Sequence, residues 1–321
     1  MTLSRDALIL KLNEIYHDLE HASYDGKHPD IVEVEIPRWR KVGKETLGRD
    51  RPKWNILDIG SGTGFVPLQL LDWLGPNDCL TCSDVSAIML DNCRTHLKSA
   101  ELRSTLQLLK LDGTTFDLPD QSQDVITLNA VMHHLAKPDD TCREINRLLK
   151  PGGRVLIGHE PNRSHLFNRF LTWNYWLLLP IADPKLFAYE VILRLGLFEF
   201  LRHPLGRIVP ELNNHNTLLA AVNTRLLKDG DIEKPLGAAK LSSLLDAQSP
   251  TAGGAHLDRG FARADFANFF PGYAMEVFET YKHLNKIHPR YNWLRRYEAY
   301  LARRLPAEGS SLFCVLRKPA P

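Results

Sequence analysis

A glycine-dense loop that follows an apolar, strand-like run is the feature that most constrains this chain. The stretch 55–65 reads NILDIGSGTGF, with an acid at Asp58, glycines at positions 60, 62 and 64, and a helical pattern from Phe65 onwards. Glycine lacks a Cβ and tolerates positive φ, so this loop can turn sharply and bring its backbone against a ligand. The next helix adds unpaired N–H groups and the positive end of its dipole. The stretch therefore predicts a strand–loop–helix ligand site in which Asp58 braces the loop or meets an ammonium group.

The spacing of the glycines differs from that of a dinucleotide-binding loop. That fingerprint is G-x-G-x-x-G, whereas here the third glycine comes one residue early and Phe65 stands where the motif needs glycine. From residue 53 the chain alternates between strand and helix patterns, which predicts a parallel sheet of βαβ units. The expected strands are 54–59, 79–84, 105–111, 123–129 and 153–158, with helices near 64–74, 86–99 and 139–149.

Acids stand at the ends of the second and third predicted strands. Asp84 follows the second strand, where a carboxylate accepts hydrogen bonds from ribose hydroxyls in open α/β sheets; capping of the next helix is the alternative role. Asp112 follows the third strand, where it could accept from an adenine amino group beside Gly113. Met89 is expected to pack against the adenine or in the core, and Asn129 and Ala130 end the fourth strand beside the glycine loop.

Together these segments resemble class I S-adenosylmethionine-dependent methyltransferases of the small-molecule type. The resemblance covers about 110 residues in family order and also includes Leu149–Gly153, a Leu-Lys-Pro-Gly-Gly turn before the fifth strand. It implies an α/β fold: a doubly wound, Rossmann-like, seven-stranded, mostly parallel sheet whose last strand is reversed. It also implies S-adenosyl-L-methionine as cofactor and S-adenosyl-L-homocysteine as product. The cofactor-binding residues it implies are Asp58, Gly60, Ser61, Gly62, Thr63, Gly64, Asp84, Val85, Met89, Asp112, Gly113, Asn129 and Ala130.

Five side chains are candidates for chemistry on the acceptor. His133 and His134 follow the fourth strand, and imidazole is suited to taking a proton near neutral pH. His159 and Glu160 end the fifth strand and should point to the same crevice, and Tyr24 comes from the N-terminal segment. The histidines could instead shape the pocket or bond to backbone. No metal site is predicted, because the two adjacent histidines lack the spacing of one helical turn.

Four segments organise the chain. Residues 1–52 are expected to form a helical lid, with a helix pair packed on the sheet edge as the alternative. Residues 53–160 are expected to form the cofactor-binding core. Residues 161–271 form a mostly helical insertion that caps the acceptor, and 272–321 hold the last two strands.

An unusually aromatic stretch opens the insertion. Residues 167–182 are too short in their uncharged part to span a bilayer. They could roof an apolar acceptor pocket, pack as an ordinary helix, or lie on a membrane surface. In the last case, the basic residues beside them would be Arg194, Arg202, His203 and Arg207. The basic, aromatic helix over 291–304 is expected to pack its apolar stripe on the sheet, so nucleic-acid binding is not predicted.

Composition limits the functional classes further. The chain of 321 residues has a formal net charge of +2, without the concentrated basic face of a nucleic-acid-binding protein. The stretch Met1–Asp6 shows no apolar run of a secretory signal, and the five scattered cysteines do not suggest a disulfide framework. We therefore expect a reduced, cytoplasmic protein.

The predicted function is transfer of a methyl group from S-adenosylmethionine to a small, apolar or aromatic acceptor, with oxygen favoured as the methylated atom. Two alternatives belong to other classes. One is a non-methylating reaction on the same fold, such as cyclisation or decarboxylation, and the other is a non-catalytic protein that binds a membrane or a partner. The acceptor and the oligomeric state are left open.

Overall fold

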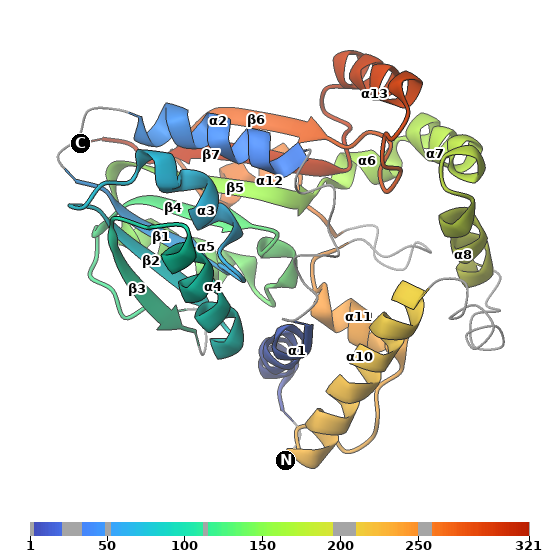
Figure 1. The fold of residues 1–321 in the computed structure, drawn as a ribbon, viewed down its shortest axis with the longest axis horizontal. Helices are drawn as coiled ribbons and strands as arrows, with labels where there is room; N and C mark the ends of the chain where they lie inside the picture. Colours follow the sequence, from blue (N-terminus) through green and yellow to red (C-terminus); the bar gives the residue numbers. More distant parts are fainter. Residues whose placement is uncertain are drawn as a thin grey trace.

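A single seven-stranded sheet organises the protein (Figure 1). The computed structural model describes residues 3–20, 34–48, 53–111, 115–194, 210–249 and 259–320. The strands are β1 (Asn55–Ile59), β2 (Cys79–Asp84), β3 (Thr105–Lys110), β4 (Gln123–Asn129), β5 (Leu149–Pro161), β6 (Ala274–Tyr281) and β7 (Ser311–Arg317). Their order in the sheet is β3-β2-β1-β4-β5-β7-β6.

The strand directions confirm the predicted fold class. Strands β1 to β5 pair in parallel, and β7 runs antiparallel to both β5 and β6. The order reverses between β1 and β4, and ligands of doubly wound sheets bind at such a switch point, outside the carboxyl ends of the strands. The predicted strands lie within a residue or two of the observed ones, except that β5 runs from Leu149 to Pro161 rather than over 153–158.

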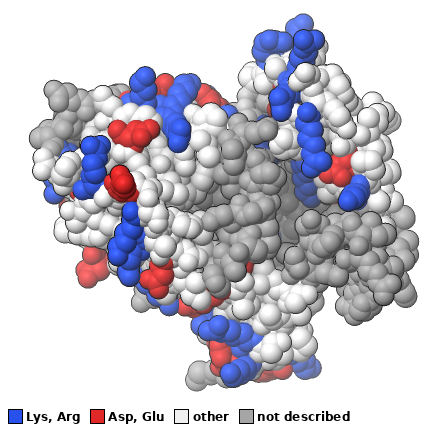
Figure 2. All heavy atoms as spheres, in the orientation of Figure 1, with Lys and Arg blue, Asp and Glu red and all other residues white. Residues whose placement is uncertain are grey.

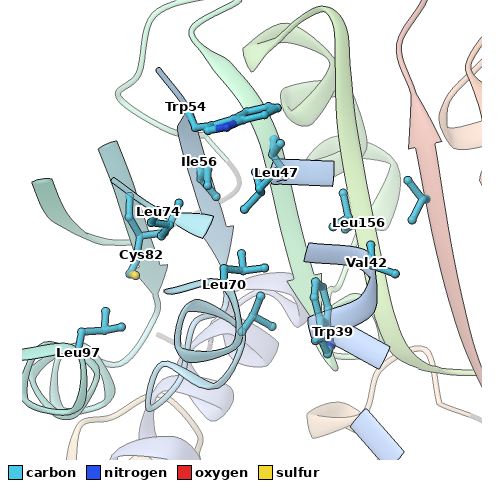
Figure 3. Packing of buried hydrophobic residues seen from close by; sticks show 14 of the residues in the cluster. Trp39, Val42, Leu47, Trp54, Ile56, Leu70, Leu74, Cys82, Leu97 and Leu156 are labelled. Carbon is cyan, nitrogen blue, oxygen red and sulfur yellow. The ribbon is translucent and has the colours of Figure 1, made fainter. Parts of the chain in front are cut away.

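One face of the sheet is covered by α2 (Ile36–Leu47), α3 (Phe65–Leu70) and α4 (Ala87–Ser99); a short 3-10 turn, Leu71–Trp73, follows α3. Figure 3 shows Trp39, Val42 and Leu47 of α2 packed over Ile56 of β1 and Leu156 of β5. Trp39 is fully buried. A helix with a stripe of this kind belongs to the core. Helix α2 therefore packs on the sheet by itself, whereas the alternative prediction was a pair of helices at the sheet edge.

The other face is covered by α5 (Pro138–Leu148) and α12 (Arg263–Phe269). Alternate strand residues point to this side: Leu57 and Ile59 pack here, whereas Ile56 packs on the opposite side. Strand side chains alternate between faces, so a sheet covered on both sides needs nearly continuous apolar strands. From Ile56 to Ile59, β1 meets that need with one exception, the buried acid Asp58.

Apart from α12, the described helices of the insertion form two separate groups. The first contains α6 (Arg163–Phe167), α7 (Arg169–Ala182) and α8 (Pro184–Arg194), and the second contains α10 (Pro210–Lys228) and α11 (Ala238–Leu245). Helix α13 (Asn292–Arg304) joins the first group. Its buried Leu294 and Leu301 cluster with Leu171 and Leu179 of α7, so the prediction that α13 packs on the sheet is wrong.

Helix α1 (Arg5–Glu20) belongs with the second group and not with α2. Its buried Ile9, Leu12 and Ile15 cluster with Leu219 and Val222 of α10 and with residues of α11. Figure 1 shows the three helices side by side below the sheet. The N-terminal segment is therefore divided between a sheet helix and a helix of the insertion. No helix among the described residues is long and apolar enough to cross a bilayer.

Candidate functional site

A cavity of about 740 Å³ lies at the switch point of the sheet. Its walls come from the ends of β1, β2, β4 and β5, from α1, and from α11. The predicted site residues that line it are Gly60, Gly62, Asp84, Val85, Met89, Asn129, Ala130, His133, His134 and His159. A cavity of this size suits one or two small molecules. The topology thus brings most of the predicted residues together.

The glycine loop has the predicted backbone geometry. Gly60, Gly62 and Gly64 have φ values of 66°, 52° and 95°, which are costly for any other residue. A Cβ on Gly60 would lie 2.4 Å from a methyl of Val131, and one on Gly64 would lie 3.0 Å from the sulfur of Cys93. A Cβ on Gly62 would meet nothing within 4 Å. Gly60 and Gly64 therefore allow close packing, and Gly62 keeps its backbone open to the cavity.

The Asp84 carboxylate lies against this loop. One oxygen accepts the Gly62 N–H at 2.9 Å, and the other accepts the Ser86 N–H at 2.9 Å. The alternative role as helix cap falls to Ser86, whose side chain accepts the Met89 N–H. Burial raises the pKa of Asp84 despite these bonds. Asp84 is thus a fixed acceptor at the cavity wall.

Asp58 lies below the loop and does not line the cavity. Its carboxylate accepts the Thr127 hydroxyl at 2.5 Å, and its carbonyl accepts the hydroxyls of Ser61 and Ser83. Burial raises the pKa of Asp58 to about 7. Of the two roles predicted for Asp58, the structure supports bracing of the loop. Ser61, Thr63 and Gly64 likewise shape the loop and are absent from the wall among the described residues.

An apolar wall follows Asp84. Val85 and Met89 line it, together with Leu111 and Phe116, which sequence reasoning did not single out. Met89 is buried, so it serves as both core and wall. The predicted adenine contacts Asp112 and Gly113 lie outside the described residues.

Two residues flanking the cavity have a left-handed backbone although they are not glycine. Ala130 has φ 57° and His159 has φ 56°. Such conformations cost free energy and concentrate at functional sites. Next to Ala130, the side-chain oxygen of Asn129 accepts the Trp39 indole N–H at 2.9 Å. Helix α2 thus fixes the end of β4 from within the core.

His133 is held by Glu160. Its ring Nδ1 lies 2.8 Å from the Glu160 carboxylate, which also accepts the backbone N–H groups of Val131, Met132 and His133. Burial lowers the pKa of His133, but the neighbouring carboxylate outweighs it, and the pKa lies above its usual value. Glu160 is fully buried and does not line the cavity. The prediction that Glu160 addresses an acceptor is therefore corrected: it positions His133.

His134 and His17 continue the row of imidazoles. The His134 ring lies 4.1 Å from that of His133 and 5.7 Å from that of His17, centre to centre. Burial and the His133 charge lower the pKa of His134, while burial and the other two rings lower the pKa of His17 to about 3. The Nδ1 of His134 donates to the carbonyl of Leu245 at 2.9 Å. The row therefore holds one raised and two lowered pKa values.

His159 makes a second histidine–carboxylate pair in the wall. Its Nδ1 lies 2.8 Å from Glu35, which precedes α2 and is buried. Burial raises the pKa of Glu35, but the hydrogen bond and charge of His159 outweigh it, and the pKa is lowered. His159 thus lines the cavity, and its role toward an acceptor stays a prediction.

The described residues offer one candidate cation group in this cavity. Ligand atoms of His133, His134 and Asp246 lie within 4.8 Å of one another. The Nδ1 atoms of both histidines already bond to Glu160 and Leu245, which leaves only Nε2 on each ring for a ligand. The absence of a resident metal stays a prediction.

Of the three roles expected for residues 167–182, the roof over the cavity is not seen among the described residues. No described residue of α7 lines it; α1 contributes Asn13, Tyr16 and His17, and α11 contributes Leu245. Tyr24 lies outside the described residues. Sequence reasoning did not select the cavity residues of α1, although one pattern pointed to them. Asn13, His17 and Glu20 place polar groups on the side of this helix that is otherwise apolar.

Comparison with known families adds to this geometry. Residues 57–157 match the family model described as "Methyltransferase domain". The ubiquinone/menaquinone biosynthesis C-methyltransferase UbiE of Vibrio campbellii is 27% identical over 157 residues, which cover 49% of this chain and 60% of the relative. UbiE of Ectopseudomonas mendocina is 29% identical over 148 residues, which cover 46% and 57%. The chain thus spans about three fifths of the relatives it matches.

Among solved structures, the fold matches over nearly its whole length. A chain from a complex of the Haloferax volcanii Trm112 methyltransferase activator aligns with a TM-score of 0.50 and 16% identity, covering 94% of this chain and 97% of that one. This likeness concerns the fold alone. The family match and the observed strand order therefore identify residues 57–157 as a methyltransferase domain of the class I type, whose methyl donor is S-adenosyl-L-methionine.

Proposed function

We propose that this protein is an enzyme that transfers the methyl group of S-adenosylmethionine to a small, largely apolar acceptor. One observation carries the proposal: a single cavity is lined by the glycine loop and Asp84 as well as by the histidine row, α1 and α11. A sulfonium methyl is already activated, so such an enzyme mainly has to align donor and acceptor.

The cofactor end fits the donor by its own features. Gly62 leaves open space where a side chain would intrude, and Asp84 presents carboxylate oxygens that suit ribose hydroxyls. Met89 and Phe116 supply an apolar wall for an adenine. When bound, S-adenosylmethionine supplies the electrophilic methyl group. In this proposal the glycine loop and the end of β4 hold the methionine end, and Asp84 holds the ribose.

His133 is proposed as the proton acceptor at the other end. The proposal assigns the Nδ1 proton to the Glu160 hydrogen bond, so the Nε2 lone pair remains to take a proton. The expected preference for oxygen has no support in the relatives, which are named C-methyltransferases. Removing a hydroxyl proton would activate either the oxygen or a carbon conjugated to it. The same base could therefore assist methylation of oxygen or of carbon. An aromatic or quinone-like ring bearing a hydroxyl suits the apolar wall best.

Two further assignments remain proposals. Helices α1 and α11 would act as the lid and acceptor cap, because both line the cavity and pack on each other.

All five cysteines are free thiols, which supports a reducing compartment such as the cytoplasm.

The test is a product assay with S-adenosylmethionine labelled in its methyl group and a panel of apolar hydroxylated rings. We expect S-adenosylhomocysteine and a labelled acceptor from the wild type. Asp84→Ala should weaken cofactor binding, measured by calorimetry, and His133→Asn should lower turnover with cofactor binding retained. Cofactor binding with an altered acceptor but no S-adenosylhomocysteine would instead indicate a non-methylating reaction. Absence of binding to cofactor and product alike would overturn the proposal.

A further inference from the structure

An apolar stripe on α7 faces away from the rest of the protein. Phe170, Trp173, Leu177 and Ile181 recur every three or four residues, and their exposed fractions are 54%, 75%, 67% and 63%. Phe167, at the end of α6, continues the stripe and is 60% exposed. The opposite side of α7, with Leu171, Tyr175 and Leu179, already packs on α13. Large apolar side chains gathered on one exposed helix face mark an interaction surface.

Helix α13 extends this stripe and adds positive charge. The two helices meet where the Tyr297 hydroxyl bonds to Asn174, which lies beside the exposed stripe of α7. Next to Tyr297 on α13 are the exposed rings of Trp293 and Tyr300, one turn to either side. The seam between the helices is therefore bordered by exposed aromatic and aliphatic side chains on both sides.

Arginines surround the aromatic part of this surface. Arg296, Arg303 and Arg304 are exposed on α13, and Arg169 is exposed at the start of α7. The single acid of α13, Glu298, is turned inward and bonds to His283 and Leu284. Figure 2 shows the blue basic atoms gathered at the upper right, where Figure 1 places α13. The surface thus combines large apolar side chains with a net positive rim.

We propose that this α7–α13 surface binds the face of an anionic phospholipid bilayer. Exposed Trp, Phe and Leu side chains enter the boundary between headgroups and acyl chains, and a basic rim is attracted to anionic headgroups. Figure 1 shows α7 and α13 at the outer edge of the molecule. The inference does not depend on the proposed methyl transfer, since none of these side chains lines the cavity. Arg202, His203 and Arg207, predicted as the basic flank, lie outside the described residues, as does the side chain of Arg194, so α13 carries the charge in this proposal.

The test is co-sedimentation of the full chain with vesicles of phosphatidylcholine, with and without phosphatidylglycerol. We expect binding to the anionic vesicles that weakens as salt rises. Trp173→Asn combined with Leu177→Gln removes two exposed apolar groups and should weaken binding by on the order of tenfold or more. Arg296→Gln combined with Arg303→Gln should weaken binding to anionic vesicles by about tenfold.

Matched controls come from α4. Ile88→Gln changes an apolar side chain that is 39% exposed, and Arg94→Gln combined with Lys98→Gln removes two exposed charges. These variants should bind as the wild type does. Circular dichroism and thermal melts should show all variants folded, because every replaced side chain is on the surface.

Three results would overturn the proposal. The first is a wild type that stays in the supernatant with anionic vesicles. The second is equal binding by the Trp173→Asn, Leu177→Gln variant. The third is a wild type that sediments as a dimer without lipid and whose α7 variant is a monomer, which would make this surface an interface between two copies of the chain.

Discussion

Glu160 and His133 are joined twice, because the buried carboxylate accepts the His133 backbone N–H at 3.1 Å and lies 2.8 Å from the ring Nδ1. The same carboxylate accepts two more backbone N–H groups of the turn. One side chain therefore fixes the position of the histidine, its ring orientation and its protonation. A proton acceptor held in this way needs little reorganisation during a reaction.

Replacing Glu160 with Gln should affect both stability and the pH profile. The amide cannot satisfy all the N–H groups that the carboxylate accepts, so we expect a loss of about 1–3 kcal/mol in the free energy of unfolding. Without the negative charge, the pKa of His133 should fall. Since a base acts when deprotonated, the acidic limb of kcat/KM should move to lower pH. His133→Asn should remove that limb.

Glu298 offers a matched control for this prediction. Its carboxylate also accepts two backbone N–H groups, of His283 and Leu284, and lies 3.0 Å from the His283 Nδ1. It stands outside the cavity. Glu298→Gln should destabilise the protein similarly but leave the pH profile unchanged. An unshifted profile in Glu160→Gln would remove His133 from the proposed role.

A comparison of two glycines distinguishes the effect of backbone strain on stability from the effect of ligand contact on binding. Gly62 and Gly152 both have positive φ, 52° and 76°, and a Cβ on either would meet nothing within 4 Å. Ala at either position should therefore cost about 1–2 kcal/mol of stability from its conformation. Only Gly62→Ala should also weaken binding of S-adenosylhomocysteine in calorimetry, by about tenfold or more, because only Gly62 lines the cavity. Equal binding by the two variants would contradict the placement of the cofactor at this loop.

Asp58 should make stability depend on pH in an unusual direction. Its pKa of about 7 in the folded protein exceeds the value of about 4 expected in the unfolded chain. Between these values the folded state holds a proton that the unfolded state has lost, so stability falls as pH rises, by up to about 1.4 kcal/mol per pH unit. Asp58→Asn keeps an acceptor for Thr127 and should remove this dependence.

Urea unfolding at about pH 5 and about pH 8 measures that effect. The change between the two conditions should be smaller in Asp58→Asn than in the wild type. Asp91→Asn, at an exposed position of α4, should behave as the wild type does. An identical change in all three proteins would show that Asp58 keeps an ordinary pKa.

Helices α1 and α2 should respond differently to the cofactor. Helix α1 lines the cavity and contacts the cofactor-binding domain through polar pairs such as Asp18 with Ser86 and Glu14 with Lys110. Helix α2 is anchored in the core by Trp39. In hydrogen exchange, S-adenosylhomocysteine should slow exchange in α1 and leave α2 nearly unchanged. Slowing confined to the glycine loop would argue against α1 as a lid.

The absence of a resident metal is open to a direct test. The proposed function assigns both Nδ1 atoms of His133 and His134 to Glu160 and the Leu245 carbonyl, and methyl transfer from a sulfonium needs no metal. Activity should therefore survive dialysis against EDTA. Loss of activity that Mg²⁺ or Zn²⁺ restores, with loss of the restored activity in Asp246→Asn, would assign the cation group a function instead.

The sequence predicted the parts of the site that depend on local chemistry. The strand–loop–helix around Gly60 and Gly62 needs particular backbone conformations, and only glycine meets them at low cost. The positions of Asp84 and Asn129 follow from that loop, because parallel strands of similar length end at one edge of the sheet. These features are encoded within short segments.

Features that depend on distant contacts could not be predicted in the same way. His159 and Glu160 are adjacent at a strand end, and only the pairing of β5 with its neighbours decides that one lines the cavity while the other is buried beneath it. Helix α7 is apolar on most sides, so periodicity does not identify the side that packs on α13. The partnership of α1 with α11 joins segments more than 200 residues apart, as in the Asn13 bond to Leu245.

The place of β7 in the sheet has a consequence for synthesis. It lies between β5 and β6, and β6 has no other neighbour in the sheet. Until Ser311–Arg317 has left the ribosome, β6 has no other strand among the described residues to pair with, and the apolar edge of β5 is open. Unpaired edges of this kind promote aggregation of nascent chains. We therefore expect production of this protein to depend on chaperones that shield these edges until Ser311–Arg317 emerges.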